Sequence, residues 1–111
     1  MKSVYLICSE SLDGNRIYKI GITKRDIENR LKEFRTGNCS NLYLVDLYKS
    51  EWASKIESQL HKIFMAKRIS GEWFNLDAND LVLFKEKCNL IHSNLELIST
   101  QNTYYLERGR F

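Results

Sequence analysis

The chain has 111 residues, of which 43% are hydrophobic and 28% are charged, a balance typical of one globular domain and not of a disordered chain. Its 17 lysines and arginines outnumber its 14 aspartates and glutamates, and this excess lies in the first half of the sequence. The apolar runs are only strand-sized and the N-terminus lacks a signal-peptide pattern, which argues against a membrane span and against secretion.

The cysteines indicate a reducing compartment. Cys8, Cys39 and Cys88 lie far apart and form no CxxC pair, so we expect neither a disulfide framework nor a zinc site. The sequence therefore predicts a cytoplasmic protein, or one that acts in a host nucleus if its source is a virus.

The first half of the chain predicts a β-hairpin followed by a helix. Residues 2–8 and 16–22 are rich in β-branched and aromatic side chains, and Asp13-Gly14 between them is typical of a hairpin turn. Thr23 is the expected N-cap of the helix, with Asp26 at its third position. The helix then carries an apolar stripe formed by Ile27, Leu31 and Phe34, and Gly37 is its expected end.

The second half predicts one more strand and two helices. Residues 42–48 form the strand, Ser50 caps the second helix, and Asp77 caps the third. The helical pattern fades after residue 92, so residues 93–111 are read as a C-terminal extension, either an edge strand or a flexible tail. The predicted fold is α+β, a small three-stranded antiparallel sheet flanked by helices in the order β-β-α-β-α-α, with one domain over residues 1–92.

Strand alternation separates a core face of the hairpin from a functional face. The core face is predicted to carry Val4, Leu6, Cys8, Tyr18, Ile20 and Ile22. Tyr5 and Lys19 would then meet on the opposite face. Gly21 lies on that face as well, and its missing side chain would leave space for a phosphate to approach.

A series of short motifs follows this order of elements. It consists of Ser3-Val4-Tyr5, Lys19-Ile20-Gly21, Arg30-Leu31, Ile56-Glu57 with Leu60-His61 and Phe64, and Gly71-Glu72-Trp73-Phe74-Asn75. The series resembles the GIY-YIG endonuclease superfamily, in the branch common in phage and large-virus proteins. Ser3 and Lys19 depart from the motif that names the superfamily. The resemblance implies a nuclease that cuts phosphodiester bonds in DNA.

Two residues carry the acid–base and phosphate roles that this resemblance implies. Tyr5 would be the general base, and the Lys19 ammonium would lower the pKa of its phenol so that some phenolate exists at neutral pH. Arg30 would donate to the phosphate oxygens, with Arg25 as the competing choice.

The metal in this interpretation is a single Mg²⁺ or Mn²⁺ ion held by Glu57, because a hard cation takes carboxylate oxygen and shares the phosphate. His61, one helical turn further, would orient a phosphate or water, or pack at the helix edge. Asn75 would hydrogen-bond within the active site, although helix capping explains it equally well.

Several basic residues complete the predicted interface with DNA, namely Lys24, Arg25, Lys32 and Arg35. The alternative to a metal-dependent DNA endonuclease is a non-catalytic nucleic-acid-binding module that acts through a partner, which the basic first half would serve equally well. Because the chain has no room for a separate recognition domain, targeting by a protein partner or by a dimer is expected.

Overall fold

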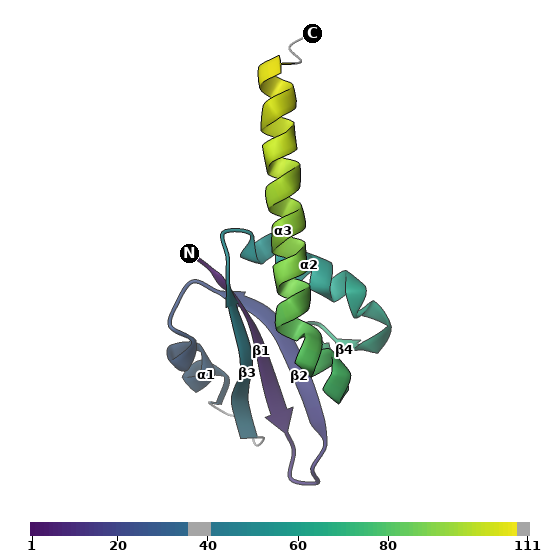
Figure 1. The fold of residues 1–111 in the computed structure, drawn as a ribbon. Helices are drawn as coiled ribbons and strands as arrows, with labels where there is room; N and C mark the ends of the chain where they lie inside the picture. The colour runs from purple at the N-terminus through teal and green to yellow at the C-terminus, as the bar shows by residue number, and fades with distance from the viewer. Residues whose placement is uncertain (36–40, 109–111) are drawn as a thin grey trace.

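The computed structural model describes residues 1–35 and 41–108, with side chains described over 1–33 and 41–100. The predictions made for the side chains of Phe34 and Arg35, and for Gly37 and Cys39, lie outside the described residues. Figure 1 shows the chain as a β-sheet with helices on both of its faces and a long C-terminal helix that projects from the body.

The sheet begins with the predicted hairpin. Strands β1 (Ser3–Glu10) and β2 (Arg16–Thr23) pair antiparallel over their whole length. Gly14 has φ +89°, a left-handed conformation that a residue with a side chain adopts only at a cost, so it allows the tight turn between the strands. Strand β3 (Asn41–Lys49) pairs antiparallel with the other edge of β1. These three strands confirm the predicted antiparallel sheet.

Two short strands extend the sheet beyond the prediction. After helix α2 (Ala53–Ile63) and a 3₁₀ turn (Met65–Lys67), β4 (Arg68–Ser70) and β5 (Trp73–Phe74) form a second small hairpin. The sheet order is β3-β1-β2-β5-β4, so the prediction of three strands is wrong by two. Strands of two and three residues are too short to show a periodic pattern, which is why the sequence did not reveal them.

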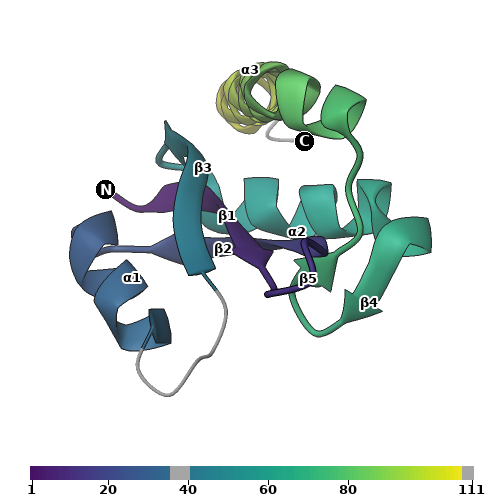
Figure 2. The same cartoon turned by 90° about the horizontal axis from the view of Figure 1, so that it is seen from below.

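The helices cover both faces of the sheet (Figure 2). Helices α2 and α3 (Ala78–Arg108) pack on the face that carries Val4, Leu6 and Ile20, which confirms the predicted core face. Helix α1 (Ile27–Arg35) covers the other face, where Tyr5 and Ile7 pack against Leu31 and Leu42 in a second, smaller core. The face predicted to be purely functional is therefore partly a core, because α1 lies on it.

The predicted helix cap is confirmed in one of three cases. Asp77 and Asp80 form a reciprocal cap at the start of α3, in which each carboxylate accepts from the other residue's backbone N–H. Ser50 does not cap α2: it accepts from the Trp52 backbone N–H, and Trp52 itself occupies the N-cap position without a side-chain cap. The prediction for α1 is wrong: Asp26 accepts from the Glu28 N–H and caps the helix, while Thr23 is the last residue of β2.

The C-terminal extension continues α3. Residues 93–108 belong to the same helix that begins at Ala78, so the interpretation of this segment as an edge strand is wrong. The apolar stripe that packs on the domain continues at helical spacing to Leu95, which supports the helix past residue 92. Of the helices that the structure describes, none is long and apolar enough to cross a bilayer.

Candidate active site

The hydroxyl of Tyr5 lies over Gly21. The two residues face each other directly in the β1–β2 register, and a Cβ added to Gly21 would overlap the Tyr5 hydroxyl and lie 2.8 Å from Glu72 Oε1. The missing side chain of Gly21 therefore houses the phenol and brings it close to a carboxylate. The predicted phosphate space above Gly21 is filled by the protein itself, which corrects that expectation.

Tyr5 is buried and its phenol is a weak acid. Its side chain is 1% exposed, and burial together with the negative charge of Glu72 raises the pKa of Tyr5 to about 12. A hydrogen bond from Arg30 opposes this shift without overcoming it. Lys19 was expected to lower this pKa, and that expectation is wrong: Lys19 stands opposite Ile7, two pairs further along the hairpin, and the pKa of Tyr5 is raised.

Lys19 forms an ion pair with Glu72. Its ammonium lies 3.5 Å from Glu72 Oε1 and 5.6 Å from the centre of the Trp73 ring. The pairing of β5 with β2 causes this arrangement, since it sets Trp73 opposite Lys19. Glu72 comes immediately before β5, and its backbone carbonyl accepts from the Ile20 N–H at 3.1 Å.

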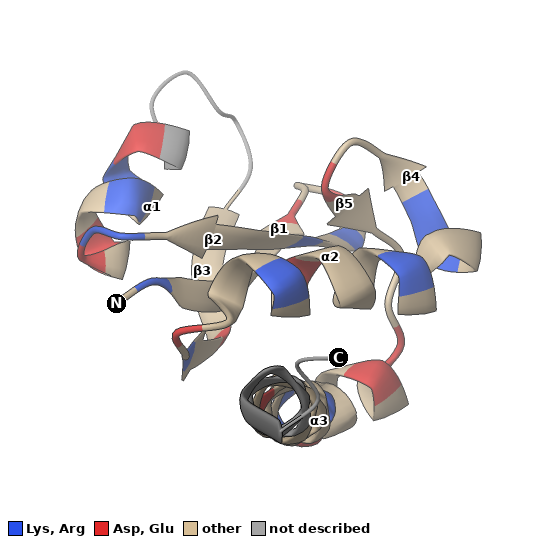
Figure 3. Ribbon diagram, turned by 90° about the horizontal axis from the view of Figure 1, so that it is seen from above, with Lys and Arg blue, Asp and Glu red and all other residues tan. Residues whose placement is uncertain are grey.

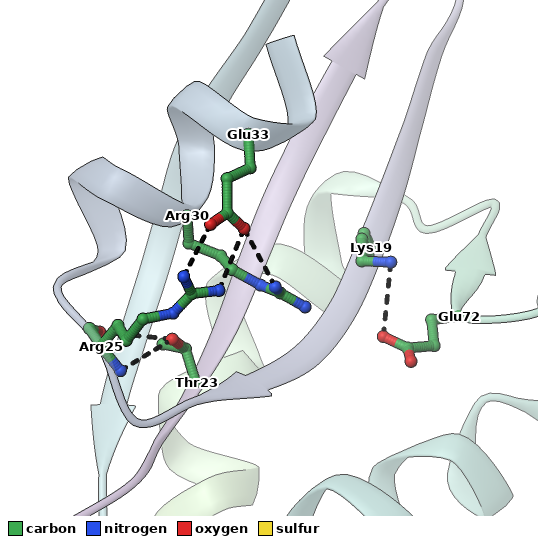
Figure 4. A network of polar contacts seen from close by, with 6 residues as sticks. All are labelled: Lys19, Thr23, Arg25, Arg30, Glu33 and Glu72. Carbon is green, nitrogen blue, oxygen red and sulfur yellow. Dashed lines mark hydrogen bonds and ion pairs between the residues drawn. The ribbon is translucent and has the colours of Figure 1, made fainter. Parts of the chain in front are cut away.

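Arg30 reaches over the sheet from α1, as Figure 4 shows. Its guanidinium hydrogen-bonds the Tyr5 phenol and lies 3.2 Å from Glu33. The competing arginine, Arg25, is bound to both oxygens of Glu33 at 2.6 and 3.0 Å and stays on the outer surface of α1. Of the two arginines, Arg30 is thus the one that reaches the group around Tyr5, although its role toward phosphate remains a prediction.

Glu57 lies on α2 within electrostatic reach of the same group. Desolvation raises the pKa of Glu57, and the negative charge of Glu72 raises it further, while His61 and Lys19 oppose both effects. Two carboxylates are therefore near each other, although only Glu57 was predicted. Within residues 1–33 and 41–100, no three acidic, histidine or cysteine side chains converge as a closed metal site would require.

His61 is held by the sheet. Its Nε2 lies 2.9 Å from the Ile20 carbonyl oxygen, and its ring meets Phe74 edge to face at 5.0 Å. Because a carbonyl oxygen only accepts, Nε2 carries the proton in this bond. The structure thus gives His61 the packing position that was one of the two predicted alternatives, and a role toward substrate stays a prediction.

Asn75 does not join these residues. Its exposed side chain lines a groove of about 480 Å³ with Lys67, Arg68 and Ile69, whereas the group around Tyr5 lines none of it. Its alternative role as a helix cap is also wrong, because Asp77 caps α3. The prediction that Asn75 hydrogen-bonds within the active site therefore finds no support in its position, which follows the end of β5 and turns toward β4.

The predicted DNA-contacting residues are spread along α1 and its approach. Lys24 and Lys32 are exposed, while Arg25 is bound to Glu33. Figure 3 shows that basic and acidic positions alternate along this part of the chain, so the excess of positive charge does not form a face of one sign. The side chain of Arg35 lies outside the described residues.

Glu72 is the site residue that the sequence analysis missed. Its signal was the Gly71-Glu72-Trp73 step, which was noted only as part of the motif series. The arrangement combines two cations, Lys19 and Arg30, with two carboxylates, Glu57 and Glu72, on the sheet between α1 and α2. Such a mixed site can bind an anion through its cations and accept a proton or a metal ion through its carboxylates.

Comparison with known proteins identifies a family. Residues 2–96 match the family model of the T5orf172 domain. Two proteins of Invertebrate iridescent virus 6 are similar to the chain: the putative KilA-N domain-containing protein 315L, 32% identical over 92 residues, and the uncharacterized protein 460R, 33% identical over 78 residues. The alignments cover 78% and 68% of this chain but only 39% and 35% of those proteins, so the chain spans little more than a third of their length. No solved structure matches the chain.

This family match corrects the superfamily assignment made from the motifs. The family that the comparison identifies is the T5orf172 domain and not the GIY-YIG superfamily, so the earlier assignment is wrong. The motifs are short, and their apolar members have structural roles, since Val4 and Ile20 are core residues and Gly21 accommodates Tyr5. Residues that mainly build a hairpin do not identify a superfamily.

Proposed function

The chain belongs to the T5orf172 domain family, and we propose that it is a nucleic-acid-binding module that hydrolyses phosphodiester bonds in DNA with one divalent metal ion. The family match supports a nucleic-acid-binding or nuclease-like module. The observation that carries the proposal is the Lys19–Glu72 ion pair beside Tyr5, with Arg30 and Glu57 close enough for their charges to act on the Tyr5 phenol.

The two cations suit the binding of a phosphodiester. Arg30 presents a planar guanidinium that can bind two phosphate oxygens, and Lys19 adds a compact positive charge. Both come from regular elements, which keeps their positions defined before the substrate arrives. Negative charge grows on the phosphate oxygens as the reaction approaches its transition state. These donors would therefore stabilise the transition state more than they stabilise the bound substrate.

Glu57 is the residue that would hold the metal. Burial, and after it the nearby charge of Glu72, raise the pKa of Glu57, and a bound cation would relieve the repulsion between the two carboxylates. Oxygen donors fit Mg²⁺ or Mn²⁺, which retain several waters and so do not need a closed set of protein ligands. When bound, the ion would polarise the phosphate and neutralise the departing oxygen.

Contacts with the DNA backbone would come from α1 and its approach. Lys24 and Lys32 are exposed and suited to phosphate contact, whereas Arg25 would first have to leave Glu33. Such contacts position a duplex without reading its sequence. We therefore propose that selection of a target depends on a protein partner or on a dimer.

A nicking assay tests this function. Supercoiled plasmid is incubated with the protein in Mg²⁺ or Mn²⁺, beside an EDTA control and the variants Glu57→Gln and Lys19→Ala. Glu10→Gln is the matched control, since Glu10 is also in an ion pair, with Arg16, but lies at the far end of the hairpin. We expect metal-dependent nicking that Glu57→Gln lowers by about 100-fold or more and Glu10→Gln leaves unchanged.

The alternative function is a non-catalytic nucleic-acid-binding module that acts through a partner. The burial of Tyr5 favours it, since a buried phenol with a pKa of about 12 cannot serve as the base that the sequence analysis expected. Fluorescence anisotropy with a DNA duplex separates the two functions. Salt-dependent binding without nicking in either metal would contradict the nuclease and leave the binding module.

A further inference from the structure

We propose that Glu72 is the catalytic base of this site, accepting the proton of the water that attacks the phosphodiester, in place of Tyr5. The proposal rests on the proposed nuclease function and names the residue that the motifs did not single out. It depends on the position of the Glu72 carboxylate among Lys19, Gly21 and Glu57.

Accessibility separates the two candidates for the base. The Tyr5 side chain is 1% exposed beneath α1, so neither an attacking water nor a DNA strand reaches its hydroxyl in this arrangement. The Glu72 side chain is 44% exposed, and its Oε1 lies 2.8 Å from the point that a Cβ on Gly21 would occupy. A base must be reached by the water whose proton it takes, and the Glu72 carboxylate is open to solvent where the Tyr5 hydroxyl is not.

The backbone holds Glu72 in place independently of its side chain. Its carbonyl oxygen accepts from the Ile20 N–H at 3.1 Å, and the next residue, Trp73, pairs with Lys19 in the sheet. Lys19 then fixes the carboxylate at 3.5 Å. A base held by a strand and an ion pair loses little freedom when the substrate binds, which is the property that a catalytic group requires.

The charges around the phenol point the same way. Tyr5 is faced by Arg30 from α1, by Glu57 from α2 and by Glu72, and burial and the two carboxylates together outweigh the arginine. A phenol in this environment stays protonated at neutral pH, so it cannot take up the proton of an attacking water. Glu72, in contrast, lies 3.5 Å from the Lys19 ammonium, whose positive charge offsets the repulsion that a carboxylate would exert on a phosphate.

The proposed step balances as an ordinary hydrolysis. One proton of the water passes to a Glu72 oxygen as the water oxygen forms a bond to phosphorus, and the bond from phosphorus to the 3′ oxygen breaks. The 3′ oxygen takes a proton from solvent, and Glu72 later returns its own proton to solvent. One water is consumed, and the products are a 5′ phosphate and a 3′ hydroxyl.

Three variants test the assignment in the plasmid assay: Glu72→Gln, Glu72→Ala and Tyr5→Phe, with Glu10→Gln as control. We expect the two Glu72 variants to lose about 100-fold or more in nicking rate, since general-base catalysis contributes about 10²–10⁴-fold. Tyr5→Phe should lose less than tenfold. Duplex binding by anisotropy should stay within about twofold for all of them, and circular dichroism confirms that each is folded.

Chemical rescue distinguishes a base from a structural residue. Glu72→Ala removes an exposed carboxylate and leaves its space open to solvent, so added formate should restore nicking at least tenfold, whereas chloride at the same ionic strength should not. Glu72→Asp, which keeps the carboxylate, should retain part of the activity. A side chain that only supports the fold would show neither response.

The outcomes also separate this inference from the function on which it rests. If wild-type protein nicks and Glu72→Gln nicks equally well, or if formate fails to rescue Glu72→Ala while Tyr5→Phe is inactive, the Glu72 assignment is wrong and the nuclease stands. If wild-type protein does not nick the plasmid in either metal, the nuclease function fails and the assignment falls with it.

Discussion

Replacing Gly21 by alanine places a methyl group where the Tyr5 phenol lies. The added Cβ would overlap the Tyr5 hydroxyl and lie 2.8 Å from Glu72 Oε1, a distance that real Cβ contacts do not show. Glu72 is exposed enough to turn away, but Tyr5 is enclosed between the sheet and α1. Gly21 does not have a positive φ, so the backbone itself accepts alanine and any cost comes from this contact.

Two opposing effects set the size of the change. Alanine restricts the unfolded chain and would by itself raise the free energy of unfolding by about 0.4–1 kcal/mol. Overfilling a packed core costs about 1–3 kcal/mol, and the upper half of that range applies because the Tyr5 ring has no exposed side toward which to move. We therefore expect Gly21→Ala to lower the free energy of unfolding by about 1–2.5 kcal/mol, or the Tm by roughly 4–10 °C.

A double-mutant cycle with urea unfolding measures this effect. In a Tyr5→Leu background the end of the ring is absent, so Gly21→Ala should cost less than about 0.5 kcal/mol there. The difference between the two backgrounds is the energy of the contact. Equal unfolding free energies for the wild type and Gly21→Ala, or the same cost in both backgrounds, would show that the phenol does not occupy the space above Gly21.

Three further predictions concern pH and stability. The folded-state pKa of Tyr5 is raised to about 12, so the stability that the neutral phenol contributes should be fully present below pH 10 and lost as the pH rises to 12. In urea unfolding at stepped pH, the unfolding free energy of the wild type should fall over this range by about 2.7 kcal/mol more than that of Tyr5→Phe. Parallel curves for the two proteins would contradict the burial of the phenol. Phe84→Ala should lower the unfolding free energy by about 3–5 kcal/mol, seen as an earlier thermal transition, because Phe84 is fully buried where α3 meets the sheet. Asp77→Ala should cost about 1 kcal/mol in the same measurement through the lost cap of α3, and an unchanged Tm would argue against the reciprocal cap with Asp80.

The parts of the fold that could be predicted from the sequence are those determined by residues close together in the chain, such as strand alternation, helical stripes and helix caps. Alternation in the hairpin separated the two faces of β1 and β2, and helical stripes located α1, α2 and the start of α3. The Asp77 cap was also visible, because a cap involves residues only three positions apart. Each of these features requires a few neighbouring residues and no knowledge of the rest of the chain.

The parts that the sequence did not predict depend on distant segments meeting. Strand β5 has only two residues, and its position is fixed by pairing with β2 more than fifty residues earlier. That pairing brings Glu72 to Lys19, so this carboxylate could not be found from spacing along the chain. The burial of Tyr5 likewise depends on the position of α1. Strand alternation assigns Tyr5 to a face of the sheet but does not predict which element covers that face.

The contact between Tyr5 and Gly21 gives two residues of the hairpin motifs a structural role. A strand tyrosine directly opposite a glycine fills the space that the glycine leaves, so the pair is a packing unit of the hairpin, whatever reaction occurs beside it. The Glu72 side chain lies at the edge of that unit and is 44% exposed, while its partner Lys19 is only 17% exposed. Chemistry on a large anion such as DNA requires groups that the anion can reach, so the proposed reaction fits Glu72 better than the buried tyrosine.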